Sequence, residues 1–123
     1  MLRASLLLIA ASTLGSTACH DESCTLIAHN AVEIEVRDSI TGEPAADSAT
    51  GRITRGTQAF DLQLTGWMAE HVGLWLTSRG SGPGTYQVEV SKPGYRTWQQ
   101  SGVVVTEGDC GMNTVRLQAR LQR

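Results

Sequence analysis

The chain has 123 residues, 41% of them hydrophobic and 18% charged, with 12 acidic residues against 10 basic ones for a formal charge of −2. This composition lies far from that of disordered segments, so we expect the chain to fold. Its length excludes a large multi-domain enzyme, and the scattered arginines give no basic patch for nucleic acid.

The first 18 residues have the pattern of an export signal. Arg3 gives a positive start, and the apolar run 6–14 is shorter than the about 20 residues that cross a bilayer. Small residues then lead to Cys19. The segment resembles a bacterial lipoprotein signal, in which the cysteine after the cleavage site accepts the lipid, although Ser16 stands where such signals usually have leucine. We expect removal of residues 1–18 as a signal peptide; ordinary secretion with an unlipidated Cys19 is the alternative.

The lipoprotein resemblance implies a location in the cell envelope. Two acyl chains on Cys19 hold a protein on a membrane where one chain does not. In Gram-negative lipoproteins an aspartate after the cysteine favours the inner membrane, and His20 stands here, so the resemblance implies the outer membrane, facing the periplasm. Residues 19–23 then form the tether, which at about 3.5 Å per residue keeps the domain within some 20 Å of the bilayer.

An odd number of cysteines is explained if one carries lipid and two pair. Disulfides persist outside the cytoplasm, so we expect a Cys24–Cys110 bridge. In the chain-entropy model a loop of about 86 residues is worth roughly 4 to 5 kcal/mol. A metal site of Cys19, His20, Cys24 and His29 is the competing interpretation, but these residues lack the ordered spacings of zinc sites. We expect no metal and no cofactor.

Residues 24–123 are expected to form one β domain, because alternation of apolar and polar residues dominates. Turn signals separate the alternating runs, for example at 41–44 and 92–94, which is typical of an antiparallel sandwich or barrel. For residues 67–76 the pattern is compatible with either a strand or a helical turn. The residues expected to face inward are Val32, Ile34, Val36, Phe60, Leu62, Leu64, Tyr86, Val88, Val90, Val115, Leu117, Ala119 and Leu121. We expect the Tyr86 hydroxyl to reach a backbone carbonyl.

Two motifs stand out along the chain. In the first an alternating strand is followed by Asp38 and then by Thr-Gly-x-Pro at 41–44, and in the second Gly-x-Tyr-x-Val-x-Val at 84–90 is followed by Pro-Gly-Tyr at 93–95. Together they resemble the carboxypeptidase regulatory-like (transthyretin-like) domain. The likeness covers most of residues 24–121 and implies an all-β fold, an antiparallel seven-stranded β-sandwich. Proteins with that fold have many different functions, so the resemblance implies no catalytic site. The order of the motifs also looks like that of uncharacterised bacterial lipoproteins with this single domain. The residues that carry the likeness are Asp38, Thr41, Gly42 and Pro44, and then Gly84, Tyr86, Val88, Val90, Pro93, Gly94 and Tyr95.

No catalytic motif accompanies the three histidines, His20, His29 and His71. A general base needs an oriented partner and a nucleophile within hydrogen-bond reach. Ser81 lacks the G-x-S-x-G spacing of a nucleophile elbow, and the glycines around it feed a strand rather than a helix, so we expect a loop there. We therefore expect that the protein is not an enzyme.

The sequence predicts a lipid-anchored cell-envelope protein whose non-catalytic β-sandwich is a binding, structural or accessory module. Its partners would be the membrane, through Cys19, and an unknown envelope protein or glycan, with no nucleic acid. One alternative is a carbohydrate-binding or substrate-recruiting module that uses exposed Trp67, Trp75 and Trp98, unless these pack beneath loops. A second alternative is a small periplasmic hydrolase with His71 or His29 beside an acid and a nucleophile.

Overall fold

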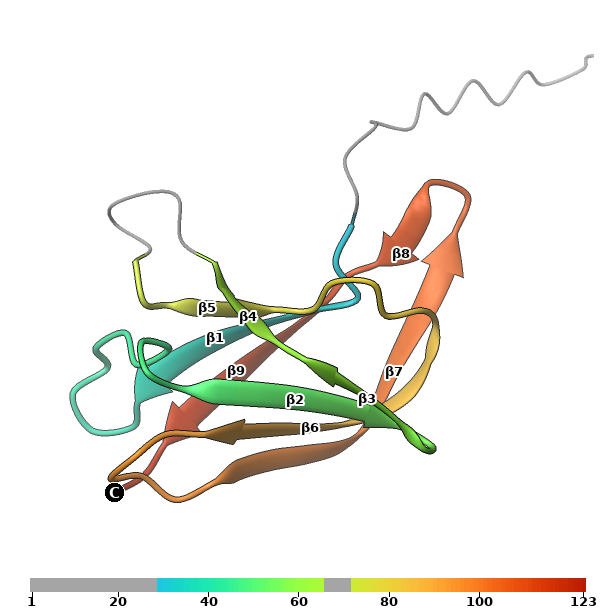
Figure 1. The fold of residues 1–123 in the computed structure, drawn as a ribbon. Helices are drawn as coiled ribbons and strands as arrows, with labels where there is room; N and C mark the ends of the chain where they lie inside the picture. Colours follow the sequence, from blue (N-terminus) through green and yellow to red (C-terminus); the bar gives the residue numbers. More distant parts are fainter. Residues whose placement is uncertain (1–28, 66–71) are drawn as a thin grey trace, which may run out of the picture.

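A computed structural model describes residues 29–65 and 72–123. In these ranges the chain forms only β structure, in two sheets (Figure 1). The expected signal 1–18, the tether 19–23, Cys19, His20 and Cys24 lie outside the described residues. The strands are β1 (Val32–Asp38), β2 (Thr50–Arg55), β3 (Gln58–Asp61), β4 (Gln63–Thr65), β5 (Trp75–Thr77), β6 (Gly84–Ser91), β7 (Trp98–Gly108), β8 (Gly111–Asn113) and β9 (Val115–Leu121).

The all-β expectation is confirmed over the described residues, but two of its details are wrong. The described ranges hold nine strands, ordered β4-β5-β1-β9 and β3-β2-β6-β7-β8, where seven were expected. The arrangement is not wholly antiparallel, because β1 and β9 run parallel from Val32↔Val115 to Asp38↔Leu121. Alternation shows which face of a strand is apolar and is the same for both strand directions, so it could not reveal this pairing.

The alternating run 58–65 forms two strands, one in each sheet, instead of a single strand. This accounts for part of the difference between the expected and observed numbers of strands. Strand β3 pairs with β2, whereas β4 pairs with β5 in the other sheet. Leu62 lies between them, and its N–H donates to the Gly51 carbonyl oxygen at 2.8 Å. Leu64 was expected to be buried, and this is wrong: it lies opposite Leu76 but is 52% exposed, because β4 is an edge strand.

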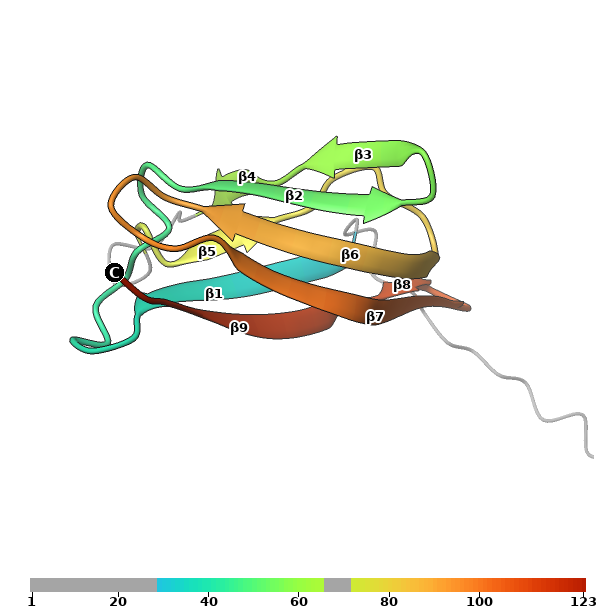
Figure 2. The same cartoon turned by 90° about the horizontal axis from the view of Figure 1, so that it is seen from below.

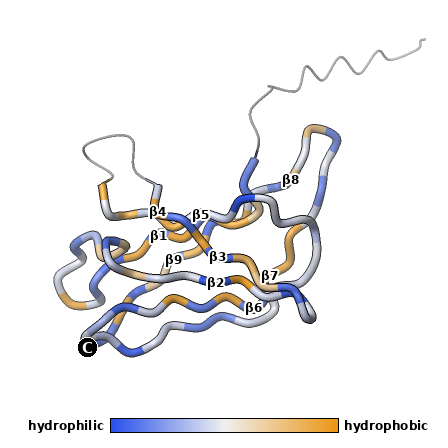
Figure 3. Tube along the Cα trace, viewed as in Figure 1, coloured by the Kyte–Doolittle hydropathy of each residue, from blue (hydrophilic) through white to orange (hydrophobic). Residues whose placement is uncertain are grey.

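The core lies between the sheets, where β2 and β6 lie across from β1 and β9 (Figure 2). Hydrophobic and hydrophilic residues alternate along these strands (Figure 3), which gives each sheet one apolar face. The inward faces expected for β1, β6 and β9 are confirmed. Their buried side chains are Val32, Ile34, Val36, Tyr86, Val88, Val90, Leu117, Ala119 and Leu121, with Val115 partly buried against them.

The uncertain segment 67–76 is a strand at its described end. Trp75 begins β5, and Leu76 is buried opposite Ile34. Leu74 is buried in the turn before β5, whereas Val72 is exposed. The possible helical turn, including Trp67 and His71, lies outside the described residues.

Candidate functional site

The two sequence motifs meet at one end of the domain, around Asp38. This carboxylate ends β1, is 6% exposed, and accepts N–H bonds on Oδ1 from Ile40 at 2.8 Å and Thr41 at 2.9 Å. The Tyr95 hydroxyl, from the turn after β6, donates to Oδ2 at 2.7 Å. The Arg123 guanidinium lies 3.5 Å from the same oxygen. A single side chain thus joins the end of β1, the β6–β7 turn and the carboxyl terminus.

These donors stabilise the charged form of Asp38. The backbone N–H of Thr41 has the largest effect, followed by the Tyr95 hydroxyl and the N–H of Ile40, and together they hold the pKa of Asp38 well below its ordinary value against the opposing effect of burial. In return, the hydrogen bond to Tyr95 and the nearby charges raise the pKa of Arg123. Asp38 therefore stays charged in the folded protein and holds the turn and the Tyr95 hydroxyl through these hydrogen bonds.

Two cations lie over the ring of Tyr95. Lys92 Nζ lies 5.9 Å and Arg123 Cζ 5.1 Å from its centroid. The same Lys92 ammonium donates to the carbonyl oxygens of Ala45 at 3.1 Å and Asp47 at 2.5 Å. Side chains therefore cross-link two loops and the carboxyl terminus at this end of the molecule.

A second tyrosine organises the beginning of β6. The Tyr86 hydroxyl donates to the Gly82 carbonyl oxygen at 2.5 Å, which confirms the expected backbone contact. It also accepts from Arg55 at 3.2 Å, and the Tyr86 ring packs edge-on against Phe60, with centroids 6.4 Å apart. A tyrosine bonded to backbone a few residues upstream is the tyrosine corner of β-sandwich proteins. Tyr86 is thus a structural anchor.

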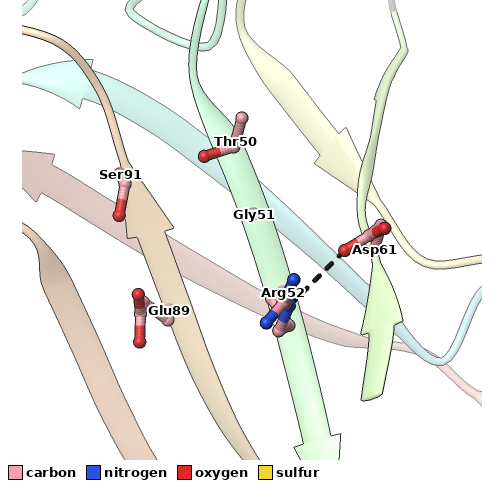
Figure 4. Close-up of a pocket in the computed structure, with 6 residues that line it drawn as sticks. All are labelled: Thr50, Gly51, Arg52, Asp61, Glu89 and Ser91. Carbon is pink, nitrogen blue, oxygen red and sulfur yellow. Dashed lines mark ion pairs between the residues drawn. The ribbon is translucent and has the colours of Figure 1, made fainter.

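A polar depression lies over β2, β3 and β6 and has a volume of ≈ 240 Å³ (Figure 4). Arg52 stands between Asp61 on β3 and Glu89 on β6, directly opposite both in register. Its Nε lies 3.5 Å from Asp61 Oδ1, and both side chains are largely exposed. Sequence reasoning missed this group, because its members come from three separate strands. An exposed ion pair is worth little and provides no desolvated acid for catalysis.

The β7–β8 hairpin carries Cys110, the described member of the expected disulfide. Cys110 lies in the hairpin turn and interacts with another part of the chain. Cys24 lies outside the described residues, so the pairing stays a prediction. A Cβ added to Gly111 would lie 3.7 Å from the His29 ring, so the described chain begins beside this hairpin.

Among the described residues, the other candidates for chemistry, Ser81 and His29, form no catalytic or metal-binding group. Ser81 lies in the expected irregular segment before β6, and its buried hydroxyl has no hydrogen-bond partner among the residues described. Within 29–65 and 72–123, no three His, Cys, Asp or Glu side chains are grouped to hold a metal ion. The same ranges contain no helix long and apolar enough to cross a membrane.

The described tryptophans lie in different sheets. Trp75 in β5 stands opposite Glu35 and Thr65, on the outer face of the four-stranded sheet. Trp98 begins β7 opposite Val90, packs against the core and lines a groove beside β9. Trp75 and Trp98 therefore form no continuous platform, and Trp67 lies outside the described residues.

No protein-family model matches the chain, and a comparison with curated proteins found no match.

Proposed function

We propose that the protein is a lipid-anchored component of the cell envelope whose two-sheet domain acts as a non-catalytic binding, structural or accessory module. The observation that carries the proposal is the run that ends at Cys19, with Arg3, a short apolar stretch and small residues before the cysteine. We place the protein in the outer membrane, facing the periplasm, on the basis of His20 after the acceptor cysteine.

The direction in which the chain joins the domain supports the anchoring proposal. The described chain begins beside the β7–β8 hairpin, at the end of the domain away from the carboxyl terminus (Figure 1). A lipid on Cys19, ten residues and so at most about 35 Å of extended chain before His29, would tether the domain from this end. The end with Asp38 and Tyr95 would lie away from the tether, free for a partner.

We also infer that the domain is a divergent carboxypeptidase regulatory-like (transthyretin-like) domain. The 2.7 Å hydrogen bond from Tyr95 to Asp38 supports this, because it joins the two motifs that carry the resemblance. The proposal concerns the fold, and that fold hosts many functions, so it assigns no activity.

Metabolic labelling with a fatty-acid probe tests the anchor. We expect label on the wild-type protein and none on Cys19→Ser, because that thiol is the acceptor. The Cys24→Ser variant is the matched control and should keep its label. An unlabelled wild-type protein, or label that survives Cys19→Ser, would contradict the proposal.

A carbohydrate-binding role is the second candidate, and the position of Trp98 favours it. Trp98 is half-buried, so part of its indole remains accessible at the wall of the groove beside β9. Aromatic walls with a few polar groups are typical of small-molecule sites. The glycan partner would then bind at this groove.

A further inference from the structure

We propose that the groove between the start of β7 and the end of β9 binds an anionic saccharide, a sugar ring that bears a carboxylate or a phosphate. The inference deepens the proposed binding role and rests on that role, though not on lipid anchoring. The groove has a volume of ≈ 250 Å³ and is lined by Arg96, Thr97, Trp98, Gln99, Arg120 and Gln122. This is near the lower end of ligand pockets, about 300 Å³, which suits a single ring.

The groove joins segments that are far apart in sequence. Arg96 follows the β6–β7 turn, whereas Arg120 lies near the end of β9. The backbone N–H of Arg96 donates to the Gln122 carbonyl oxygen at 2.7 Å, which fixes the two segments side by side. The backbones that carry both guanidinium groups are therefore held in place before any ligand arrives, which lowers the entropic cost of binding.

Two arginines at the groove have no ion-pair partner among the described residues. Arg37, Arg52, Arg116 and Arg123 each lie within ion-pair distance of a carboxylate. Within 29–65 and 72–123, Arg96 and Arg120 have no such carboxylate, and none of the six residues lining the groove is acidic. Guanidinium groups match carboxylate and phosphate oxygens in geometry and charge, so this groove favours an anion.

The remaining lining residues favour a sugar over a bare anion. Trp98 lines the groove and packs against the core, which holds it in place, and an indole is a side chain on which a sugar ring can stack. Thr97, Gln99 and Gln122 bring a hydroxyl and two amides, which can both donate to and accept from sugar hydroxyls. The Gln99 amide already donates to Glu89 at 3.3 Å, leaving its carbonyl oxygen as an acceptor.

The groove lies at the end of the domain that is far from the β7–β8 hairpin. Arg96 and Gln122 are next to the carboxyl terminus, whereas the chain enters beside β8 (Figure 1). On an anchored protein the groove would face away from the membrane. A polymer of the surrounding envelope could therefore reach it.

Isothermal titration calorimetry on the full-length protein, purified from cells, tests the proposal with four probes. They are an oligogalacturonate for the carboxylated class, glucose 6-phosphate for the phosphorylated class, neutral maltotetraose and inorganic phosphate. We expect one charged sugar to bind at least tenfold more tightly than both neutral sugar and phosphate, and the tighter of the two identifies the anionic group. No binding of either charged sugar overturns the proposal, as does equal affinity for maltotetraose or for phosphate.

Arginine variants locate the site. We expect Arg96→Gln and Arg120→Gln each to lower the affinity about tenfold, because each removes a charge-assisted hydrogen bond. Arg79→Gln, an exposed arginine outside the groove, is the matched charge control and should bind like the wild type. An equal loss in Arg79→Gln would mean attraction to net charge alone and overturn the proposal. Circular dichroism melting verifies that each variant is folded. Fatty-acid labelling tests the lipid anchor and does not involve the groove, whereas calorimetry tests binding at the groove. Failure of the anchoring proposal and failure of the binding proposal are therefore distinguishable.

Discussion

At the residue scale, Asp38 is the side chain on which one end of the domain depends. It stands at the last position of β1, where the chain must leave the sheet, and its Oδ1 accepts the N–H groups of Ile40 and Thr41 that no strand partner takes. An aspartate that bonds to backbone two and three residues ahead nucleates a turn. Its second oxygen is left for Tyr95 and Arg123, so the turn is tied to two distant segments.

Removing the Tyr95 hydroxyl should weaken this end in a pH-dependent way. We expect Tyr95→Phe to lower the free energy of unfolding by about 1 kcal/mol at pH 7, because a hydrogen bond to a charged acceptor is lost while the ring stays. The folded pKa of Asp38 lies below the unfolded value of about 3.9, so its stabilisation is present above that value and is lost as the pH falls further.

The Tyr95 hydroxyl contributes to that lowered pKa, so the difference between wild type and Tyr95→Phe should narrow below about pH 4. Urea unfolding between pH 2 and 7 measures the effect. In an Asp38→Asn background, Tyr95→Phe should have a smaller effect with no acid-side narrowing. A constant difference at every pH in the wild-type background would contradict this account.

At the element scale, residues 58–65 show how one stretch of chain serves two sheets. Strand β3 belongs to one sheet and β4 to the other, and Leu62 crosses between them, 8% exposed. Room for Leu62 exists because β2 has a glycine opposite it. A Cβ added at Gly51 would lie 2.7 Å from Leu62 Cδ1 and 3.0 Å from Leu76 Cδ1. The glycine is required here for close packing.

Substitution of Gly51 should therefore be destabilising despite the extended backbone. We expect Gly51→Ala to lower the free energy of unfolding by about 1 to 3 kcal/mol, because the added methyl overpacks the core. Chemical denaturation measures this loss. In a Leu62→Ala background the clash with Cδ1 is relieved, so the added cost of Gly51→Ala should shrink. Strictly additive losses would show that the clash with the Leu62 side chain is not the cause.

At the scale of the whole molecule, the domain has two unlike ends. The β7–β8 hairpin, Cys110 and the first described residue lie together at one end. The Asp38 network and the groove with Arg96 lie at the other, near the carboxyl terminus. The second end carries Arg96 and Arg120, which have no ion-pair partner among residues 29–65 and 72–123. The two ends therefore differ in the residues that they present to their surroundings.

The predicted Cys24–Cys110 disulfide would strengthen the first of these ends. We expect reduction to lower the free energy of unfolding by roughly 4 to 5 kcal/mol, because it releases a closed loop of about 86 residues in the unfolded chain. Denaturation with and without a reducing agent measures the loss, and mass mapping without reduction should join the two peptides. The Cys24→Ser variant is the control and should not respond to reductant. Two free thiols in the wild type would refute the pairing.

The strand faces were predictable, because local alternation is enough to divide apolar from polar side chains. Val32 to Val36, Tyr86 to Val90 and Leu117 to Leu121 are buried as the pattern indicates. The exposed Leu64 was not predictable, because burial of an edge strand depends on how far the opposite sheet extends. The polar groups around Arg52 and Arg96 were also missed, since each joins residues from separate strands.

The sequence by itself determined an all-β domain, the inward residues of its main strands and the two motifs, because these depend on neighbours a few positions apart. The parallel pairing of β1 with β9, the division of 58–65 between two sheets and the contact of Asp38 with Tyr95 were decided only by the tertiary structure. Those features join residues up to about 80 positions apart, and a local pattern carries no information on which distant segments bury each other's surface.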